Sequence, residues 1–165
     1  MIRYNVFYDI AFHAIRLVPT SSATIIENNT IDLVHEVSGI SCDGSSPTIR
    51  YNIITRAMQG IRCLLAADPI FECNNIFDVK VGRYVGTCSD QTGMNGNISV
   101  DPEYCGIDDS GNYLLQSDSP CAPGNHPEGY SCGQIGAKGV GCEEVPVTQS
   151  TWGAIKSRFR KEDPK

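Results

Sequence analysis

Three aspartates recur at comparable points of a sequence repeat and could together do acid–base chemistry. Asp9, Asp32 and Asp78 follow an asparagine of the repeat by four, three and four residues. Two carboxylates held side by side can serve as a general acid and a general base, and their repulsion can raise one pKa. The same residues also suit a turn or a strand end, so both the catalytic and the structural interpretation stay open.

Two arginines form a second candidate site, for binding an acidic sugar. Arg16 and Arg62 occupy equivalent points of the repeat and flank Ser41 between them. A guanidinium group binds a carboxylate through paired hydrogen bonds. Tyr4 and Tyr51, two repeats apart, could stack on sugar rings or be half-buried in the fold.

An Ile-x-x-Asn pattern must position these residues. Its asparagines, Asn5, Asn29, Asn52 and Asn74, stand 24, 23 and 22 residues apart, and Asn97 follows in a weaker copy. A period of this length marks a solenoid, in which each repeat buries its apolar side against its neighbours. Short β-branched runs alternate with Gly, Ser, Pro and Asp, and no amphipathic helix separates them, so the pattern predicts a parallel β-helix with one coil per repeat.

Stacked coils bring equivalent residues into columns about 4.8 Å apart. The asparagine column predicts a structural ladder of amides at a coil corner, because Asn tolerates left-handed turns and stacked amides hydrogen-bond. A second column alternates in charge and is expected to face solvent, since unlike charges on neighbouring strands attract. Because successive side chains of a strand point to opposite sides, the residue before each charged residue is expected to point into the bore. The charged column is Arg3, Glu27, Arg50 and Glu72, and the bore column is Ile2, Ile26, Ile49 and Phe71.

The stretch from Gly39 to Ile54, Gly-Ile-x-Cys…Ser-Ser-Pro-Thr-Ile-x-x-Asn-x-Ile, resembles the repeats of right-handed parallel β-helix proteins of the pectate-lyase-like superfamily. Residues 96–102, 115–121 and 132–137 are similar to the C-terminal part of secreted bacterial members. The resemblance covers roughly residues 1–142 and implies an all-β fold. It says less about activity, because the superfamily holds lyases, hydrolases, epimerases and members of no known activity.

The net charge of −6 argues against a nucleic-acid partner and would repel an anionic polysaccharide overall. The chain has no apolar run of membrane-spanning length and no signal peptide. Because Met1 leads directly into a repeat strand, we expect an N-terminally truncated solenoid. Its upstream coils and signal peptide would belong to a longer protein that is secreted or displayed on the cell surface.

Cysteines are concentrated after the last clear repeat, where a thin core would need disulfides. We favour Cys105–Cys121 and Cys132–Cys142, although spacing alone leaves other pairings open. Cys42 shares a column with Leu17 and Cys63 and should point inward as a small apolar residue.

No metal site is expected, because the chain has no C-x2-C pair and its histidines are scattered. The acidic turn at 108–112 lacks the spacing of an EF-hand loop, so calcium is only an alternative there and no cofactor is expected.

The chain is therefore expected to have three parts. Residues 1–106 form coils, residues 107–142 form a disulfide-linked C-terminal cap, and residues 143–165 form a linker with a short amphipathic helix at 151–160. The expected function is a non-catalytic extracellular module that binds a polysaccharide or serves adhesion. The alternative is the C-terminal part of a polysaccharide lyase or glycoside hydrolase whose catalytic coils lie upstream.

Overall fold

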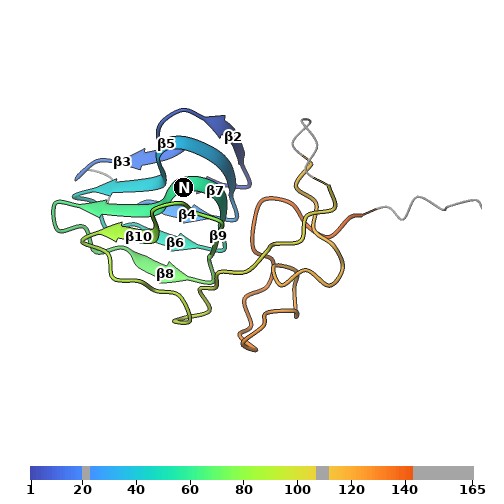
Figure 1. Ribbon diagram of the computed structural model, residues 1–165. Helices are drawn as coiled ribbons and strands as arrows, with labels where there is room; N and C mark the ends of the chain where they lie inside the picture. Colours follow the sequence, from blue (N-terminus) through green and yellow to red (C-terminus); the bar gives the residue numbers. More distant parts are fainter. Residues whose placement is uncertain (20–22, 107–111, 143–165) are drawn as a thin grey trace, which may run out of the picture.

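The computed structural model describes residues 1–19, 23–106 and 112–142 and shows an all-β protein, a parallel β-solenoid of about 4 turns. Figure 1 shows the coils stacked on one another, with the chain from about residue 99 onward beside them. The prediction of an all-β solenoid built from parallel coils is confirmed. The predicted helix at 151–160 lies outside the described residues.

Each coil contributes to three facets. The first facet is a sheet in the order β1 (Ile2–Arg3), β4 (Ile25–Glu27), β6 (Thr48–Arg50) and β8 (Ile70–Glu72). The second sheet has the order β10 (Gly82–Gly86), β7 (Ile53–Leu64), β5 (Thr30–Asp43) and β2 (Val6–Ile10), with β3 (Ile15–Leu17) paired to β5 and β9 (Asn75–Phe77) paired to β7. The long strands β5 and β7 each turn a corner. Their first halves make the second facet with β2 and β9, and their second halves make the third facet with β3 and β10.

Two left-handed residues in each coil shape its corners. The residue before each ladder asparagine has φ between 50° and 58° in four coils, at Tyr4, Asn28, Tyr51 and Cys73, and Gly96 follows with φ 72°. The second corner has φ between 49° and 56° at Asp9, Leu33, Arg56 and Asp78. Residues other than glycine rarely adopt this backbone conformation. Its recurrence at two fixed points therefore shows that each coil turns in the same way.

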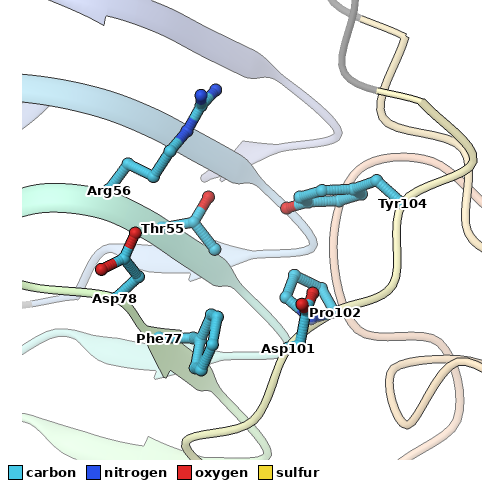
Figure 2. A pocket seen from close by; sticks show the side chains of 7 residues that line it. All are labelled: Thr55, Arg56, Phe77, Asp78, Asp101, Pro102 and Tyr104. Atoms are coloured by element: carbon cyan, nitrogen blue, oxygen red, sulfur yellow. The ribbon is translucent and has the colours of Figure 1, made fainter.

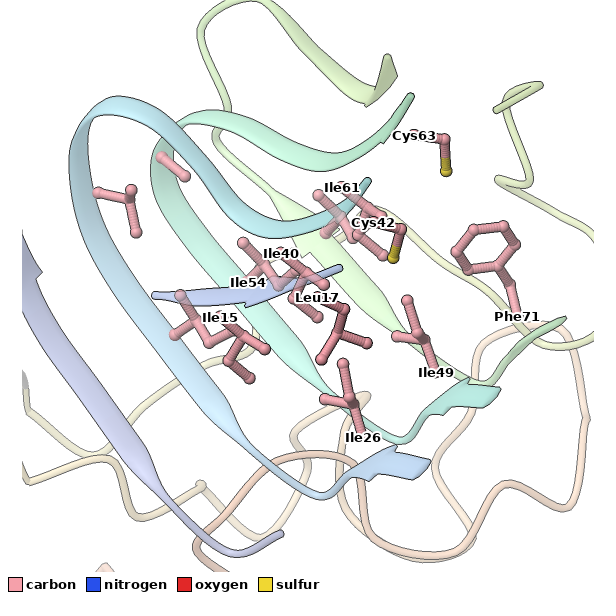
Figure 3. Close-up of a cluster of buried hydrophobic side chains, with 14 of the residues drawn as sticks. Ile15, Leu17, Ile26, Ile40, Cys42, Ile49, Ile54, Ile61, Cys63 and Phe71 are labelled. Carbon is pink, nitrogen blue, oxygen red and sulfur yellow. The ribbon is translucent and has the colours of Figure 1, made fainter. Parts of the chain in front are cut away.

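Columns of branched apolar residues fill the bore. Ile26 and Ile49 are fully buried, Phe71 is almost so, and Ile2 at the edge of the first coil is half-buried. Figure 3 shows Ile26, Ile49 and Phe71 with others from the second and third facets in one cluster, and Ile2 packs against it. Arg3, Glu27, Arg50 and Glu72 stack in register on the opposite side of the first facet. The inward and outward sides of this facet are therefore as predicted, although Glu27 is buried by its arginine neighbours.

The segment after the coils, residues 99–106 and 112–142, is called the returning segment and packs along the outer side of the second facet. Its Gly136 N–H donates to the Tyr51 carbonyl at 2.7 Å, and its Ala137 N–H donates to Thr30 Oγ1 at 3.0 Å. A second apolar cluster forms beneath it, in which Ile53 of β7 meets Leu115 and Ile135. The Cys-rich part of the chain thus covers the side of the coils.

The predicted disulfide pairs are wrong. The structure joins Cys63 to Cys88, Cys73 to Cys132 and Cys105 to Cys142. Cys121 is a free, fully buried thiol whose sulfur accepts a hydrogen bond from Asn75 Nδ2 at 3.1 Å. Because the segment returns to the coils, Cys132 meets Cys73 with a Cα–Cα distance of 5.6 Å despite a separation of 59 residues.

The inward placement of Cys42 is as predicted. Leu17, Cys42 and Cys63 are register partners, and all three are buried. Cys42 remains a free thiol, whereas Cys63 bonds to Cys88.

Candidate functional site

The asparagine column is a continuous hydrogen-bonded ladder. In each step one side-chain Oδ1 accepts from both the Nδ2 and the backbone N–H of the asparagine one coil earlier, at 3.0–3.1 Å. The ladder includes the four predicted residues Asn5, Asn29, Asn52 and Asn74, and Asn97 ends it. All but Asn5 have no exposed surface. The column therefore holds the coil corner together, and from Asn29 to Asn97 it offers no surface to a ligand.

The three candidate aspartates fall into two columns. Asp32 lies in register with Tyr8 and Thr55 on the second facet. Asp9 and Asp78 belong to the next position, the left-handed corner. The difference of one residue in their spacing from the ladder therefore places them on different parts of the coil. Asp9 is exposed and binds His35 Nε2 at 2.6 Å, so the predicted Asp9–Asp32 grouping does not form.

Asp32 is enclosed by hydrogen-bond donors. It has no exposed surface and accepts from Thr55 Oγ1 at 2.8 Å, from Arg56 Nε at 2.9 Å and also from Arg56 Nη2, and from Tyr113 at 2.7 Å. Burial by itself would raise the pKa of Asp32, but the hydrogen bonds from Arg56, Tyr113 and Thr55 outweigh it and lower that pKa below its ordinary value. A carboxylate held in this way is a structural anion and is closed to a substrate.

The two candidate arginines do flank Ser41 on the third facet. Arg16 Nε binds Asp43 at 2.7 Å, and the Ser41 hydroxyl donates to the other oxygen of Asp43 at 2.8 Å. Arg16 is therefore neutralised. Within the described ranges Arg62 forms no hydrogen bond or ion pair. The pKa of nearby His13 is lowered by burial and by the charge of Arg62.

The two candidate tyrosines lie beside cations on the first facet. The Arg3 guanidinium is 5.8 Å from the ring centre of Tyr4, and that of Arg50 is 5.5 Å from the ring centre of Tyr51. Tyr4 is 59% exposed, whereas Tyr51 is half-buried against the second apolar cluster. They do not meet the candidate aspartates or arginines in one site.

A cavity of about 180 Å³ lies where the returning segment meets the corner of the third and fourth coils. Figure 2 shows its lining residues, which come from the coils and from the segment after Val100. The left-handed corner brings Arg56 and Asp78 to its rim. The lining is formed by Thr55, Arg56, Phe77, Asp78, Asp101, Pro102 and Tyr104.

The cavity combines aromatic walls with unpaired polar groups. Phe77 and Tyr104 supply the rings, and Figure 2 shows the Tyr104 hydroxyl pointing toward Thr55. That hydroxyl oxygen is buried and has no hydrogen-bond partner of normal geometry, although the Thr55 side chain is close enough to interact with it. Burial raises the pKa of Tyr104 well above its usual range, so the hydroxyl stays protonated and can donate.

The charge of the cavity is set by its carboxylates. Asp78 forms no hydrogen bond or ion pair within the described part of the chain, and Asp101 uses one oxygen to accept from the Glu103 N–H at 3.0 Å. The Arg56 guanidinium is directed away from Phe77 and Asp78 and is held by Asp32. Only Asp78 was a candidate from the sequence. Phe77, Asp101 and Tyr104 were missed, because Asp101 and Tyr104 lie in a region with no repeat.

Over residues 1–19, 23–106 and 112–142, no group of three or more His, Cys, Asp or Glu side chains is arranged to hold a metal ion. In the same ranges no helix is long and apolar enough to span a membrane. The fold places the chain among parallel β-solenoid proteins. No known protein family, curated protein or solved structure matches it.

Proposed function

We propose that this protein is a non-catalytic extracellular β-solenoid module that binds carbohydrate in the cavity between its coils and its returning segment. The observation that carries the proposal is the lining of this cavity. Sugar rings combine apolar C–H faces with hydroxyl groups, and Phe77 and Tyr104 offer surface to the first while Asp78 and Asp101 offer acceptors to the second. The unpaired Tyr104 hydroxyl supplies a donor.

The charges favour a neutral sugar. Asp78 and Asp101 are both negative, and the positive charge of Arg56 is neutralised by its ion pair with Asp32. The whole chain is also negative. A uronate or sulfate group would therefore be repelled from this cavity. The volume is below the range of about 300–1,000 Å³ usual for drug-sized ligands, which suits one sugar ring at the end or in a bend of a chain.

The proposal that the module is non-catalytic is supported by Asp32, the aspartate with the most hydrogen-bond partners among the three candidates, because its carboxylate is sealed from solvent. One observation favours the alternative, that the chain is part of a polysaccharide lyase or glycoside hydrolase. Asp78 and Asp101 line the same cavity, and paired carboxylates are what glycoside hydrolysis needs.

An extracellular location is supported by the three disulfides, which persist in oxidising compartments. The same proposal includes two further points: the coils wind in a right-handed sense, and the protein is related to secreted bacterial proteins of the pectate-lyase-like superfamily. Both rest on the sequence resemblance of residues 1–142.

Calorimetric titration of the whole chain with neutral oligosaccharides (β-glucans, mannans and xylans) and with pectate and alginate oligomers tests the proposal. We expect a neutral oligosaccharide to bind and the uronates to fail. Phe77→Ala should weaken binding at least tenfold, and Tyr104→Phe about threefold to tenfold, because each removes one of the ligand contacts named above.

Matched control variants are Phe12→Ala and Tyr130→Phe, which change exposed rings that do not line the cavity. Equal losses in the controls, or no binding by any neutral glycan, would overturn the proposal. Release of reducing ends during the titration, abolished in Asp78→Asn, would establish the enzymatic alternative instead.

A further inference from the structure

Two carboxylates from different parts of the chain line the cavity of Figure 2. Asp78 comes from the left-handed corner of the fourth coil, and Asp101 comes from the returning segment. Within the described ranges Asp78 forms no hydrogen bond or ion pair, and Asp101 uses one oxygen to accept from the Glu103 N–H at 3.0 Å. Both oxygens of Asp78 and the second oxygen of Asp101 are therefore available to a ligand.

The cation at the rim of the cavity does not neutralise these carboxylates. Among the described residues that line the cavity, Arg56 is the only Lys, Arg or His. It forms an ion pair with Asp32, to which its Nε donates at 2.9 Å, and Figure 2 shows its guanidinium directed away from Asp78. The cavity therefore has an uncompensated negative charge, and its apolar walls strengthen the attraction of a cation.

The aromatic walls favour a ligand of the same charge. In the view of Figure 2 the Phe77 ring lies between Asp78 and Asp101. The face of an aromatic ring attracts an ammonium group and also packs against the C–H face of a sugar. The Tyr104 hydroxyl stays protonated, because burial raises the pKa of Tyr104 well above its usual range, so it adds a donor without adding a charge.

A metal ion or a simple side-chain ammonium group would use only part of this lining. Calcium takes about six to eight oxygen ligands, and no group of three or more metal-binding side chains exists over the described residues. A lysine side chain could pair with the carboxylates but would offer no hydroxyl groups to Tyr104. A sugar ring that carries an ammonium group uses the carboxylates, the rings and the hydroxyl together, and the volume of about 180 Å³ suits one ring.

We infer that the cavity selects an amino sugar, a unit whose amine is free and protonated. This inference rests on the proposed carbohydrate-binding function and names the class of sugar within it. The ammonium group pairs with Asp78 and Asp101, the ring packs on Phe77, and a sugar hydroxyl accepts from Tyr104. A neutral sugar makes the same ring contacts without the ion pair, and an N-acetylated unit loses the charge and adds bulk.

Three β-1,4-linked tetramers that differ only in the group at C2 test this inference: those of glucosamine, N-acetylglucosamine and glucose. In calorimetric titration of the whole chain, at a pH where the amines are protonated, the glucosamine tetramer should bind about tenfold more tightly than either neutral tetramer. High salt should reduce this preference, because both carboxylates belong to exposed residues. The corresponding galactosamine oligomers cover the other common ring stereochemistry.

Asp78→Asn removes the charge and suits the backbone, because Asn tolerates the left-handed conformation found there. The preference for the free amine should fall from about tenfold to about twofold in this variant. It should fall less in Asp101→Asn, because one oxygen of Asp101 is already held by the Glu103 N–H. Asp68→Asn, the same change at an exposed residue that does not line the cavity, is the matched control and should leave the preference unchanged. Circular dichroism checks that each variant folds.

Equal affinities for the free and N-acetylated oligomers in both series would overturn this inference while leaving carbohydrate binding intact. A preference that survives in Asp78→Asn, or that falls equally in Asp68→Asn, would do the same. Failure of every amino and neutral glycan to bind would overturn the proposed function as well. Lysine amide binding as tightly as the glucosamine tetramer would show that the cavity recognises the ammonium group alone, and would overturn the assignment to a sugar.

Discussion

The Tyr113 hydroxyl donates a hydrogen bond of 2.7 Å to the Asp32 carboxylate across 81 residues of sequence. Both side chains are buried, with 1% and 0% of their surfaces exposed. The Tyr113 ring also meets the ring of Tyr104 edge-on, with centres 5.1 Å apart. This one contact therefore joins the coils to the returning segment and supports a wall of the cavity.

Removing that hydroxyl should loosen the segment. Tyr113→Phe keeps the ring but takes one donor from a buried charge, so we expect the free energy of unfolding to fall by about 1–3 kcal/mol. Urea denaturation followed by fluorescence measures it. Tyr130→Phe, at a ring that is 44% exposed, serves as the control and should cost less than about 0.5 kcal/mol. Equal stabilities of the two variants would contradict the role given to Tyr113.

Asp32 should make the protein sensitive to acid. Its pKa is lower in the folded state than in the unfolded chain, because the hydrogen bonds from Arg56, Tyr113 and Thr55 overcome the effect of burial. The unfolded state therefore binds the proton more readily. The stability contributed by Asp32 is fully present above about pH 4 and is lost as the pH falls through its folded pKa.

Urea midpoints measured from neutral pH to about pH 2 test this expectation. The wild-type curve should fall more steeply below about pH 4 than the curve of Asp32→Asn, which has no carboxyl to titrate at this position. Parallel curves would show that the acid sensitivity comes from other carboxyl groups, such as Asp43, whose pKa is lowered by the hydrogen bond from Ser41.

The middle of the asparagine ladder should tolerate substitution far less than its end. Asn52→Ala leaves two donors of Asn29 and the carbonyls of Ile26 and Arg50 without a partner in a buried corner. We therefore expect the free energy of unfolding to fall by more than about 3 kcal/mol. Asn5→Ala, at the exposed end, should cost about 1 kcal/mol. Thermal and urea unfolding of the two variants give the comparison, and similar losses would mean that the ladder does not act as a buried network.

Two of the eight cysteines should be free and unreactive in the folded protein. Burial raises the pKa of both Cys42 and Cys121 to about 12, so few thiolates form at neutral pH. Alkylation with iodoacetamide should label neither thiol in the native state and both in denaturant without reductant.

Peptide mapping without reduction should recover Cys73 joined to Cys132, and a Cys132–Cys142 peptide would refute the disulfide pattern.

The coils were predictable because their pattern is repeated. Asn5, Asn29, Asn52 and Asn74 recur at nearly equal intervals, and a recurring residue in a solenoid marks a column whose neighbours are known in advance. The same logic predicted that Ile26 and Ile49 face the bore. It erred by one residue at Asp32, because a shift of one position in a strand moves a side chain to another part of the coil.

The returning segment was not predictable in the same way. Tyr104 and Tyr113 belong to no repeat, so nothing in the sequence ties them to Thr55 or Asp32. The disulfide Cys73–Cys132 was missed for the same reason, because sequence distance is a poor guide to partners once a chain doubles back on a solenoid. The cavity is built from both parts, and only its coil half carries a sequence signal.

Solenoids usually unravel coil by coil, because each repeat is held only by its neighbours. Here the returning segment reaches the second, third and fourth coils at Thr30, Tyr51 and Cys73. It spans the stack as a brace, so these three coils should melt as one cooperative unit, while the first coil, which the segment touches through the Tyr8 ring near Tyr113, is held less firmly. Reduction of Cys73–Cys132 would weaken that brace and convert a single melting transition into a gradual one.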